Sequence, residues 1–259
     1  MKRPMPQRRW KKASDKIYDA MKIAVISDVH ANLEALETCL AKLDELKPDK
    51  LVCLGDMVDY CAQPNECIEL IKNNADVVIL GNHDEAQFNF EISYGFSESA
   101  RISSVHTRTV IKPEYVEYFK ALPYSYSLEG LLFVHASPFS IPGYSYILTP
   151  ETALNNFGSF AEKICFIGHS HRPVVFEEQG ENVFEADWVN INNKYRYIIN
   201  VGSVGQPRDG DPRLSFGFFD TESFKYNNYR IEYPAQNASK KILLEGLPVI
   251  LSERILKGL

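Results

Sequence analysis

Three stretches of the chain decide its fold: KIAVISDVHAN at 22–32, KLVCLGD at 50–56 and DVVILGNHD at 76–84. Each begins with a short, β-branched apolar run, which is typical of a buried strand, and ends in polar residues. The segments between them, 32–46 and 64–72, place apolar side chains at helical spacing. Strands that recur every ~25–30 residues with a helix between them form right-handed βαβ units and a parallel sheet. The first third of the chain therefore predicts an α/β fold.

The pattern changes in the rest of the chain. Residues 88–123 contain no strand-like run, and we expect a helical, cap-like segment there. Short strand candidates follow, several of them linked closely enough to be antiparallel, with one helix at 149–157 among them. These candidates are 131–134, 164–167, 174–178, 197–201, 214–220 and 224–231. They predict a second sheet packed face to face on the first. With a helical tail at 238–257, we expect one domain over 21–259.

Composition and charge exclude several classes of protein. The 259 residues carry 28 Lys and Arg against 34 Asp and Glu, and 45% of them are hydrophobic. No run approaches the ~18 uncharged apolar residues of a membrane-spanning helix, so we expect a soluble protein with no membrane partner. Residues 1–20 hold seven Lys or Arg and two Asp, and we expect them to form a basic, disordered extension. The body is acidic, which disfavours a nucleic-acid partner.

The five cysteines indicate a reducing compartment. Their count is odd, and they form no CxxC pair. This pattern is typical of a reduced cytoplasmic protein.

Polar side chains collect where the strand candidates end. Five of the six histidines follow a strand-like run, and His106 is the exception. In open α/β sheets, ligands bind beyond the carboxyl ends of the strands. The exit residues are Asp28, His30, Asp56, Asn82, His83, Asp84, His135, His169 and His171. We therefore expect them to meet in one crevice.

The chemistry of this set is that of metal ligands. Asp28 and His30 are two residues apart, as are His169 and His171, so each pair would point to the same side of an extended strand. Imidazoles, carboxylates and an amide oxygen suit Mn²⁺, Fe, Zn²⁺ or Ni²⁺. The set has no thiolate, which argues against a structural zinc site.

The blocks SDVHAN (27–32), GDMVDY (55–60), GNHD (81–84), VHASP (134–138) and GHSHRP (168–173) resemble those of the calcineurin-like metallophosphoesterases. The segment NVGSVGQPRDGDPR (200–213) is similar to the small prokaryotic phosphodiesterase branch of that family. The resemblance implies a four-layer α/β/β/α sandwich of two mixed sheets. It also implies a dinuclear centre of two divalent ions, Mn²⁺ first among them, that activates a bridging hydroxide.

Carried over by position, the family pattern implies two ligand sets that share Asp56. The first metal would be held by Asp28, His30, Asp56 and His171. The second would be held by Asp56, Asn82, His135 and His169. His83 matches the family's non-ligating catalytic histidine, and we expect Asp84 to orient it, although Asp84 could equally cap the next helix.

One departure from the family narrows the substrate. Tyr60 stands where the protein Ser/Thr phosphatase branch has a phosphate-gripping arginine, which disfavours a protein phosphatase. Arg172 and Arg208 are then the candidates for substrate binding. The aromatic segment 88–96 could stack a nucleobase.

We therefore expect a metal-dependent phosphoesterase acting on a phosphodiester or a small phosphorylated compound, such as a nucleotide or a dinucleoside polyphosphate. The first alternative is a non-catalytic scaffold of the same fold that binds a protein partner. A phosphomonoesterase and a nuclease are further alternatives. Apolar residues of the tail could also support a homo-oligomer.

Overall fold

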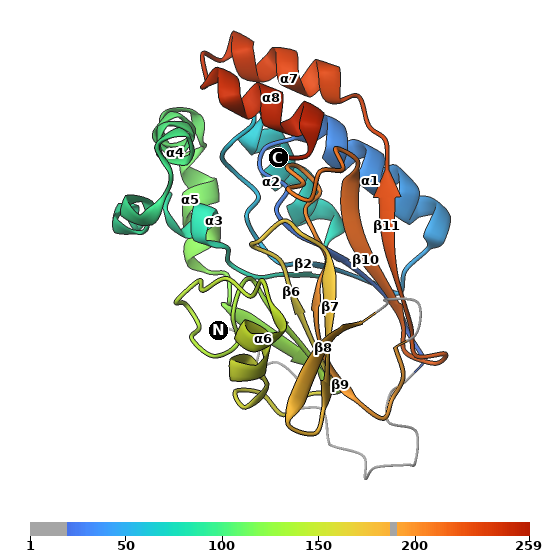
Figure 1. Cartoon of the computed structure of the whole chain (residues 1–259). Coiled ribbons are helices and arrows are strands. Elements are labelled where there is room, and N and C mark those ends of the chain that lie inside the picture. Colours follow the sequence, from blue (N-terminus) through green and yellow to red (C-terminus); the bar gives the residue numbers. More distant parts are fainter. Residues whose placement is uncertain (1–19, 187–190) are drawn as a thin grey trace, which may run out of the picture.

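A computed structural model of the chain describes residues 20–186 and 191–259 and contains two mixed β-sheets packed face to face (Figure 1). In spatial order, the first sheet consists of β11 (Lys225–Ile231), β10 (Leu214–Asp220), β1 (Lys22–Ile26), β2 (Lys50–Cys53) and β3 (Val77–Val78). The strands β1, β2 and β3 are parallel, as the βαβ pattern predicts, and β10 and β11 are antiparallel additions.

The second sheet is likewise built around a parallel centre. In spatial order, its strands are β4 (Ser125–Leu128), β5 (Leu131–Val134), β6 (Ile164–Ile167), β9 (Arg196–Asn200), β7 (Val174–Gln179) and β8 (Asn182–Ala186). Here β5, β6 and β9 are parallel, whereas β4, β7 and β8 pair antiparallel.

The main core lies between the two sheets, and β1 shows how the sequence creates it. Ile23 and Val25 point into this inter-sheet core, where Phe133 of β5 and Phe166 of β6 meet them. The alternate residues of β1 point to the opposite face and pack against helices. A strand buried on both faces must be apolar throughout, which is why its sequence is a continuous run.

Helices cover both outer faces, so the four-layer α/β/β/α arrangement is confirmed. The first sheet is covered by α1 (Leu33–Leu46), α2 (Pro64–Asn74) and α5 (Pro113–Lys120). The second is covered by α6 (Pro150–Phe157). Local signals start these helices: Asn32 caps α1 through the Ala35 N–H, and a proline opens each of the other three.

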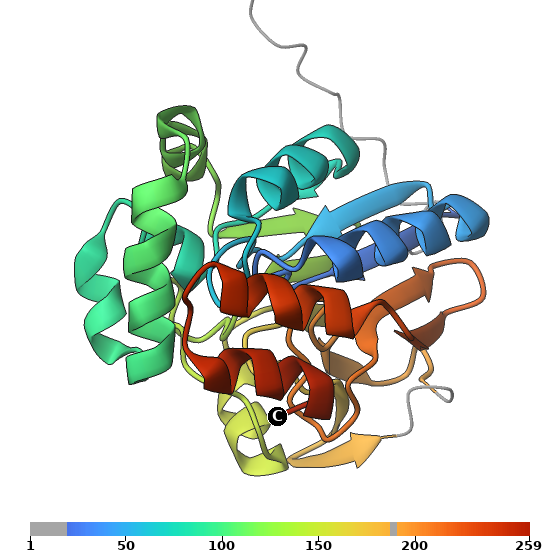
Figure 2. The same cartoon turned by 90° about the horizontal axis from the view of Figure 1, so that it is seen from above.

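Further helices flank the ends of the strands. They are α3 (Asn82–Glu85), the 3₁₀ turn η1 (Phe90–Gly95), α4 (Glu98–Val110), α7 (Ala235–Leu244) and α8 (Val249–Lys257). Seen from above, α7 and α8 form a hairpin, with α7 beside α1 (Figure 2). A separate apolar cluster joins this hairpin to Tyr60, Cys61 and Ala100 of α4.

Most predicted elements occur within one or two residues of their expected bounds, and two strands were not predicted. These are β4 and β8, both at edges of the second sheet. The third strand is also shorter than the run 76–80 indicated. Among the described helices, none is both long and apolar enough to cross a membrane. The basic segment 1–20 lies, except for its last residue, outside the described residues.

Candidate metal centre

The turns that follow the strands hold the site residues in an unusual backbone conformation. Asp28, His30, Asp56, His169 and His171 all have φ between 49° and 64°, in the left-handed region. Non-glycine residues seldom adopt it, and such strain is concentrated at functional sites. The expectation that paired residues leave an extended strand on one side was therefore wrong. The turns are instead tied together across the sheet, for example by the His30 N–H donating to the Asp56 carbonyl at 3.0 Å.

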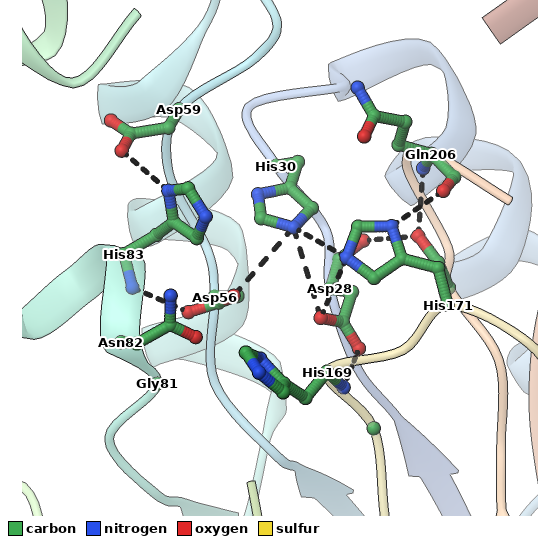
Figure 3. A network of polar contacts seen from close by, with 12 residues as sticks. Asp28, His30, Asp56, Asp59, Gly81, Asn82, His83, His169, His171 and Gln206 are labelled. Carbon is green, nitrogen blue, oxygen red and sulfur yellow. Dashed lines mark hydrogen bonds and ion pairs between the residues drawn. The ribbon is translucent and has the colours of Figure 1, made fainter. Parts of the chain in front are cut away.

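One group of ligand atoms comes from Asp28, His30 and His171, whose candidate atoms lie within 4.8 Å of one another (Figure 3). The Nε2 atoms of the two histidines are 3.1 Å apart, and that of His171 is 3.1 Å from Asp28 Oδ1. Each Nδ1–H is used elsewhere: His30 donates to a backbone carbonyl at 2.8 Å and His171 to another at 2.6 Å. Both Nε2 atoms then present lone pairs to the same point.

A second group comes from Asp56, His135 and His169. His135 donates its Nδ1–H to the Leu54 carbonyl at 2.9 Å, and its Nε2 lies 3.3 Å from Asp56 Oδ2 and 3.0 Å from Asn82 Oδ1. Asp56 lies between the groups, because its Oδ2 is also 3.7 Å from His30 Nε2.

Buried oxygen atoms test whether these groups fit a cation. Among the described residues, Asp28 Oδ1 and Asp56 Oδ2 accept no hydrogen bond of good geometry, although both carboxylates are buried, and their polar neighbours are ring nitrogens of the other candidate ligands. Burying a carboxylate oxygen without a partner costs several kcal/mol by order of magnitude. Convergent imidazole lone pairs beside unpartnered carboxylate oxygens are the donor set that a divalent transition-metal ion prefers. The residues fit a metal at both groups.

Burial and neighbouring charge set the protonation of the histidines. Burial holds the pKa of His30 and His171 well below the usual value, which keeps both rings neutral and able to bind a cation. Burial, with His135 beside it, also lowers the pKa of His169 to about 3. Burial alone would lower the pKa of His135, but the Asp56 carboxylate raises it to about 9. The histidines around Asp56, His135 foremost, outweigh burial and hold the pKa of its carboxyl well below the usual value.

His83 stands beside these groups and is oriented by Asp59. Its Nδ1–H donates to Asp59 Oδ2 at 2.7 Å, as Figure 3 shows. The other oxygen of Asp59 accepts from Gln87 Nε2 at 3.2 Å, and the ring of Phe96 stacks on His83 at 4.2 Å. Asp59 lies in the motif GDMVDY, so the sequence marks it as a residue near the site. The motif alone does not show that its partner is His83.

The expectation that Asp84 orients His83 is wrong. Its carboxylate accepts the backbone N–H groups of Asp56 and Met57, both at 2.8 Å, and that of Gly81 at 3.3 Å. Gly81 precedes α3, so Asp84 serves the start of that helix and also binds the turn that carries Asp56. Glycine is required at Gly81, where an added Cβ would collide with the Asp56 carboxylate.

A cavity of about 610 Å³ opens over His83, Asn82 and His169. The loop residues Tyr144 and Tyr146 form part of its wall, and the ring of Tyr146 stacks on His169 at 4.2 Å. The remaining lining residues are Tyr60, Ile92, Gly95, Phe96, Ser97, Pro142, Gly143, Arg172, Arg208, Arg254 and Leu259.

The structure places both predicted substrate-binding arginines in this cavity. Arg172 donates its Nε–H to the Arg208 carbonyl at 2.9 Å. The guanidinium of Arg208 binds Gln206 Oε1 at 2.8 Å and lies over the Tyr60 ring, 5.4 Å from its centre. Sequence reasoning missed Arg254, because it lies in the helical tail, far along the chain from every motif.

Comparisons with known proteins agree with this geometry. A model of the family described as calcineurin-like phosphoesterase matches residues 21–200. An uncharacterized protein of Methanocaldococcus jannaschii is 36% identical over 241 residues, which cover 91% of this chain and 98% of that protein. The crystal structure of a metallophosphoesterase from Sphaerobacter thermophilus is 34% identical, has a TM-score of 0.81, and is matched over 93% of this chain and 100% of its own. That of a hypothetical protein from Pyrococcus horikoshii OT3 has the same fold, with a TM-score of 0.75, 20% identity and coverage of 92% and 98%. The chain therefore belongs to the calcineurin-like phosphoesterase family.

Proposed function

We propose that the protein is a metal-dependent phosphoesterase that hydrolyses a phosphodiester or another small phosphorylated compound, such as a nucleotide or a dinucleoside polyphosphate. One observation carries this proposal: two buried groups of metal-ligating atoms adjoin each other at Asp56, beside a cavity that His83 lines. A phosphoester is the substrate that such a pair of cation sites suits, because its hydrolysis develops negative charge on several oxygens at once.

The chain would hold two divalent ions, with Asp56 shared between them. Asp28, His30 and His171 complete the first set, and Asn82, His135 and His169 complete the second. Bound two-metal sites, with ions about 3.5–4 Å apart, lower the pKa of water toward neutrality and stabilise the attacking and leaving oxygens. We propose Mn²⁺ as the ion, and Fe, Zn²⁺ and Ni²⁺ fit the same donor set.

His83 would supply a proton to the leaving group. Because its Nδ1–H is bound to Asp59, Nε2 is the atom free to act in the cavity. The Asp59 carboxylate would keep its hydrogen bond to Nδ1–H while Nε2 donates a proton to the leaving group. Phe96 stacks on the His83 ring, and Gln87 donates a hydrogen bond to Asp59. Both contacts position the proton donor before the substrate binds.

Residues of the cavity support a small substrate. Its volume suits a ligand of nucleotide size, and the family resemblance puts Tyr60 at the sequence position of the protein phosphatases' arginine. Arg208 lies over that ring, so a guanidinium reaches the cavity from a different segment of the chain.

The cysteines support a cytoplasmic location. All five are free, and all five are buried. Thiols that persist unpaired are typical of a reducing compartment, so we propose the cytoplasm.

The deciding experiment compares hydrolysis of bis-p-nitrophenyl phosphate and p-nitrophenyl phosphate by metal-stripped protein, with and without Mn²⁺. We expect Mn²⁺-dependent cleavage of the diester. Preference for the monoester would identify a phosphatase instead. Absence of hydrolysis of either ester by protein that holds two equivalents of metal would contradict the proposal and favour a scaffold.

Metal content provides a separate test of the shared ligand. Asp56→Asn replaces the one carboxylate that touches both groups by a neutral amide, so we expect less than one tightly bound equivalent where the wild type binds two. Metal analysis after gel filtration measures this. Asp44→Asn, at an exposed position of α1, is the matched control. Retention of two tight equivalents by Asp56→Asn would refute the shared assignment.

A further inference from the structure

The charged side chains that line the cavity are all positive. Arg172, Arg208 and Arg254 all line it, and among the described residues no Asp or Glu side chain does so. The chain as a whole carries a net charge of −6, so this cavity differs sharply from the rest of the protein. Three guanidinium groups around one space repel each other, and an anion that enters the space relieves this repulsion.

The guanidinium of Arg254 has no ion-pair partner in the described part of the chain. Among the residues that the structure describes, no carboxylate lies within ion-pair distance of it, and its guanidinium makes no hydrogen bond. Arg172 and Arg208 use only some of their donors on the backbone and on Gln206, and neither is paired with a described carboxylate. Arg213, by contrast, forms a bidentate pair with Asp211 outside the cavity. The cavity arginines therefore keep donors available for a ligand.

The fold holds Arg254 firmly at this wall. The α7–α8 hairpin is packed through Ile242, Leu251 and Ile255, which are fully buried. Beyond the end of α8, the Gly258 carbonyl accepts the Gly210 N–H at 2.8 Å, in the loop that follows Arg208. Figures 1 and 2 show the hairpin lying across the ends of the first sheet. The backbone that carries Arg254 is therefore held at the cavity wall before a ligand binds.

Arg254 and the metal groups come from different elements of the cavity wall, whereas the two other arginines adjoin His171: Arg172 follows it in the chain, and the Arg208 N–H donates to its carbonyl at 3.2 Å. Asn82, His83 and His169 mark the side of the ligand groups, and Arg254 comes from a helix that provides no candidate metal ligand. A phosphate at the ligand groups has Arg172 and Arg208 beside it, which leaves the guanidinium of Arg254 for a second anionic group of the same substrate.

We infer that the substrate carries a second phosphate beside the scissile one, and that Arg254 selects for it. This inference rests on the proposed function, since it names the class of phosphoester that the site accepts: an organic bisphosphate or polyphosphate. Arg254 is then a specificity-determining residue that the helical tail adds to the site.

Equilibrium binding to the Mn²⁺-loaded full chain tests this, with butylphosphonate and butane-1,4-bisphosphonate as probes for calorimetry. The two differ by one phosphonate group, and neither contains an ester bond that the protein could cleave. We expect the wild type to bind the bisphosphonate at least about tenfold more tightly, because the second group gains charge-assisted hydrogen bonds. Arg254→Gln should reduce that preference about tenfold, and Arg254→Lys should retain an intermediate preference.

Arg101→Gln is the matched control, because it removes the same charge from an exposed position of α4 that does not line the cavity. It should keep the wild-type preference. An equal affinity of the wild type for both probes, or an unchanged preference in Arg254→Gln, would overturn the inference. Since the probes carry no ester, a chain that prefers the bisphosphonate yet hydrolyses nothing would refute the proposed function alone.

Discussion

At the scale of single residues, strain and unsatisfied charge coincide at the metal centre. Asp28, His30 and Asp56 combine left-handed backbone conformations with complete or nearly complete burial. Each of these costs free energy, and each is tolerated because hydrogen bonds between neighbouring turns fix the conformation. The stability sacrificed here prepares the donor atoms before a cation binds, so little reorganisation is needed.

His83 and Asp59 should act as one unit. We expect His83→Ala to lower kcat by roughly 10²–10⁴-fold for a poor leaving group, because the proton donor is lost. Asp59→Asn should also lower kcat, since an amide that turns its NH₂ group to Nδ1 no longer holds the ring in the same orientation. The double variant should be hardly slower than His83→Ala, because both changes remove the same proton transfer. Steady-state kinetics with Mn²⁺ measures this, and metal content should stay at the wild-type value in all three variants. Losses that multiply would show that the residues act independently.

Asp84 should matter for stability. Asp84→Asn replaces one of the two acceptor oxygens by an NH₂ group, which cannot accept a hydrogen bond. At least one buried N–H, that of Asp56 or that of Met57, then loses its partner. We expect the free energy of unfolding to fall by about 1–3 kcal/mol. Urea denaturation measures it, with Asp44→Asn as the control for loss of an acidic group. A wild-type midpoint in Asp84→Asn would mean that these hydrogen bonds contribute nothing.

These residues also show what the sequence can reveal about the site. The candidate ligands could be predicted because each follows a strand that is recognisable on its own, and the parallel topology then brings the strand ends together. Asp59 and Asp84 were harder to assign because both lie in motifs beside ligands. Only the path of the chain decides that Asp59 reaches His83 and Asp84 reaches the Asp56 turn.

At the scale of elements, the strength of the sequence signal follows burial. After the exposed Lys22, the run that forms β1 is apolar and buried on both sheet faces, so the strand could be predicted. The strands β4 and β8 lie at sheet edges, and their residues alternate or are mostly exposed. Edge strands bury too few side chains to impose an apolar run, which is why SYSL and NVFEA were not recognised.

The end of α8 depends on one glycine. Gly258 has a φ of +69°, and an added Cβ would lie 2.6 Å from the backbone of Asp211. We expect Gly258→Ala to reduce the free energy of unfolding by about 1–2 kcal/mol from the left-handed conformation alone. Gly158→Ala is the control, because Gly158 ends α6 with a φ of −71° and open space around it. Urea denaturation compares them, and equal effects would show that the left-handed conformation of Gly258 adds no cost for alanine.

At the scale of the whole molecule, the candidate metal centre lies between the ends of the two sheets and takes residues from both. Asp28, His30, Asp56 and Asn82 follow strands of the first sheet, whereas His135, His169 and His171 follow strands of the second. A cation held by either group would therefore connect both halves of the sandwich, and metal binding should stabilise the whole fold by mass action.

The metal-free protein should accordingly show a maximum of stability near pH 6.5. Below that pH, the unfolded chain protonates His30, His169 and His171, whereas the folded chain does not because their folded pKa values are depressed. As the pH falls below 6.5, each of these three histidines should lower the free energy of unfolding by about 1.4 kcal/mol per pH unit. His135 acts in the opposite direction: its folded pKa of about 9 gives stability that is complete below pH 6.5 and is lost as pH rises toward 9. Urea denaturation of EDTA-treated protein from pH 5 to 9 measures the curve, and repetition with excess Mn²⁺ should raise it throughout. A metal-free stability that stays level across this range would show that the buried histidines are not held in these protonation states.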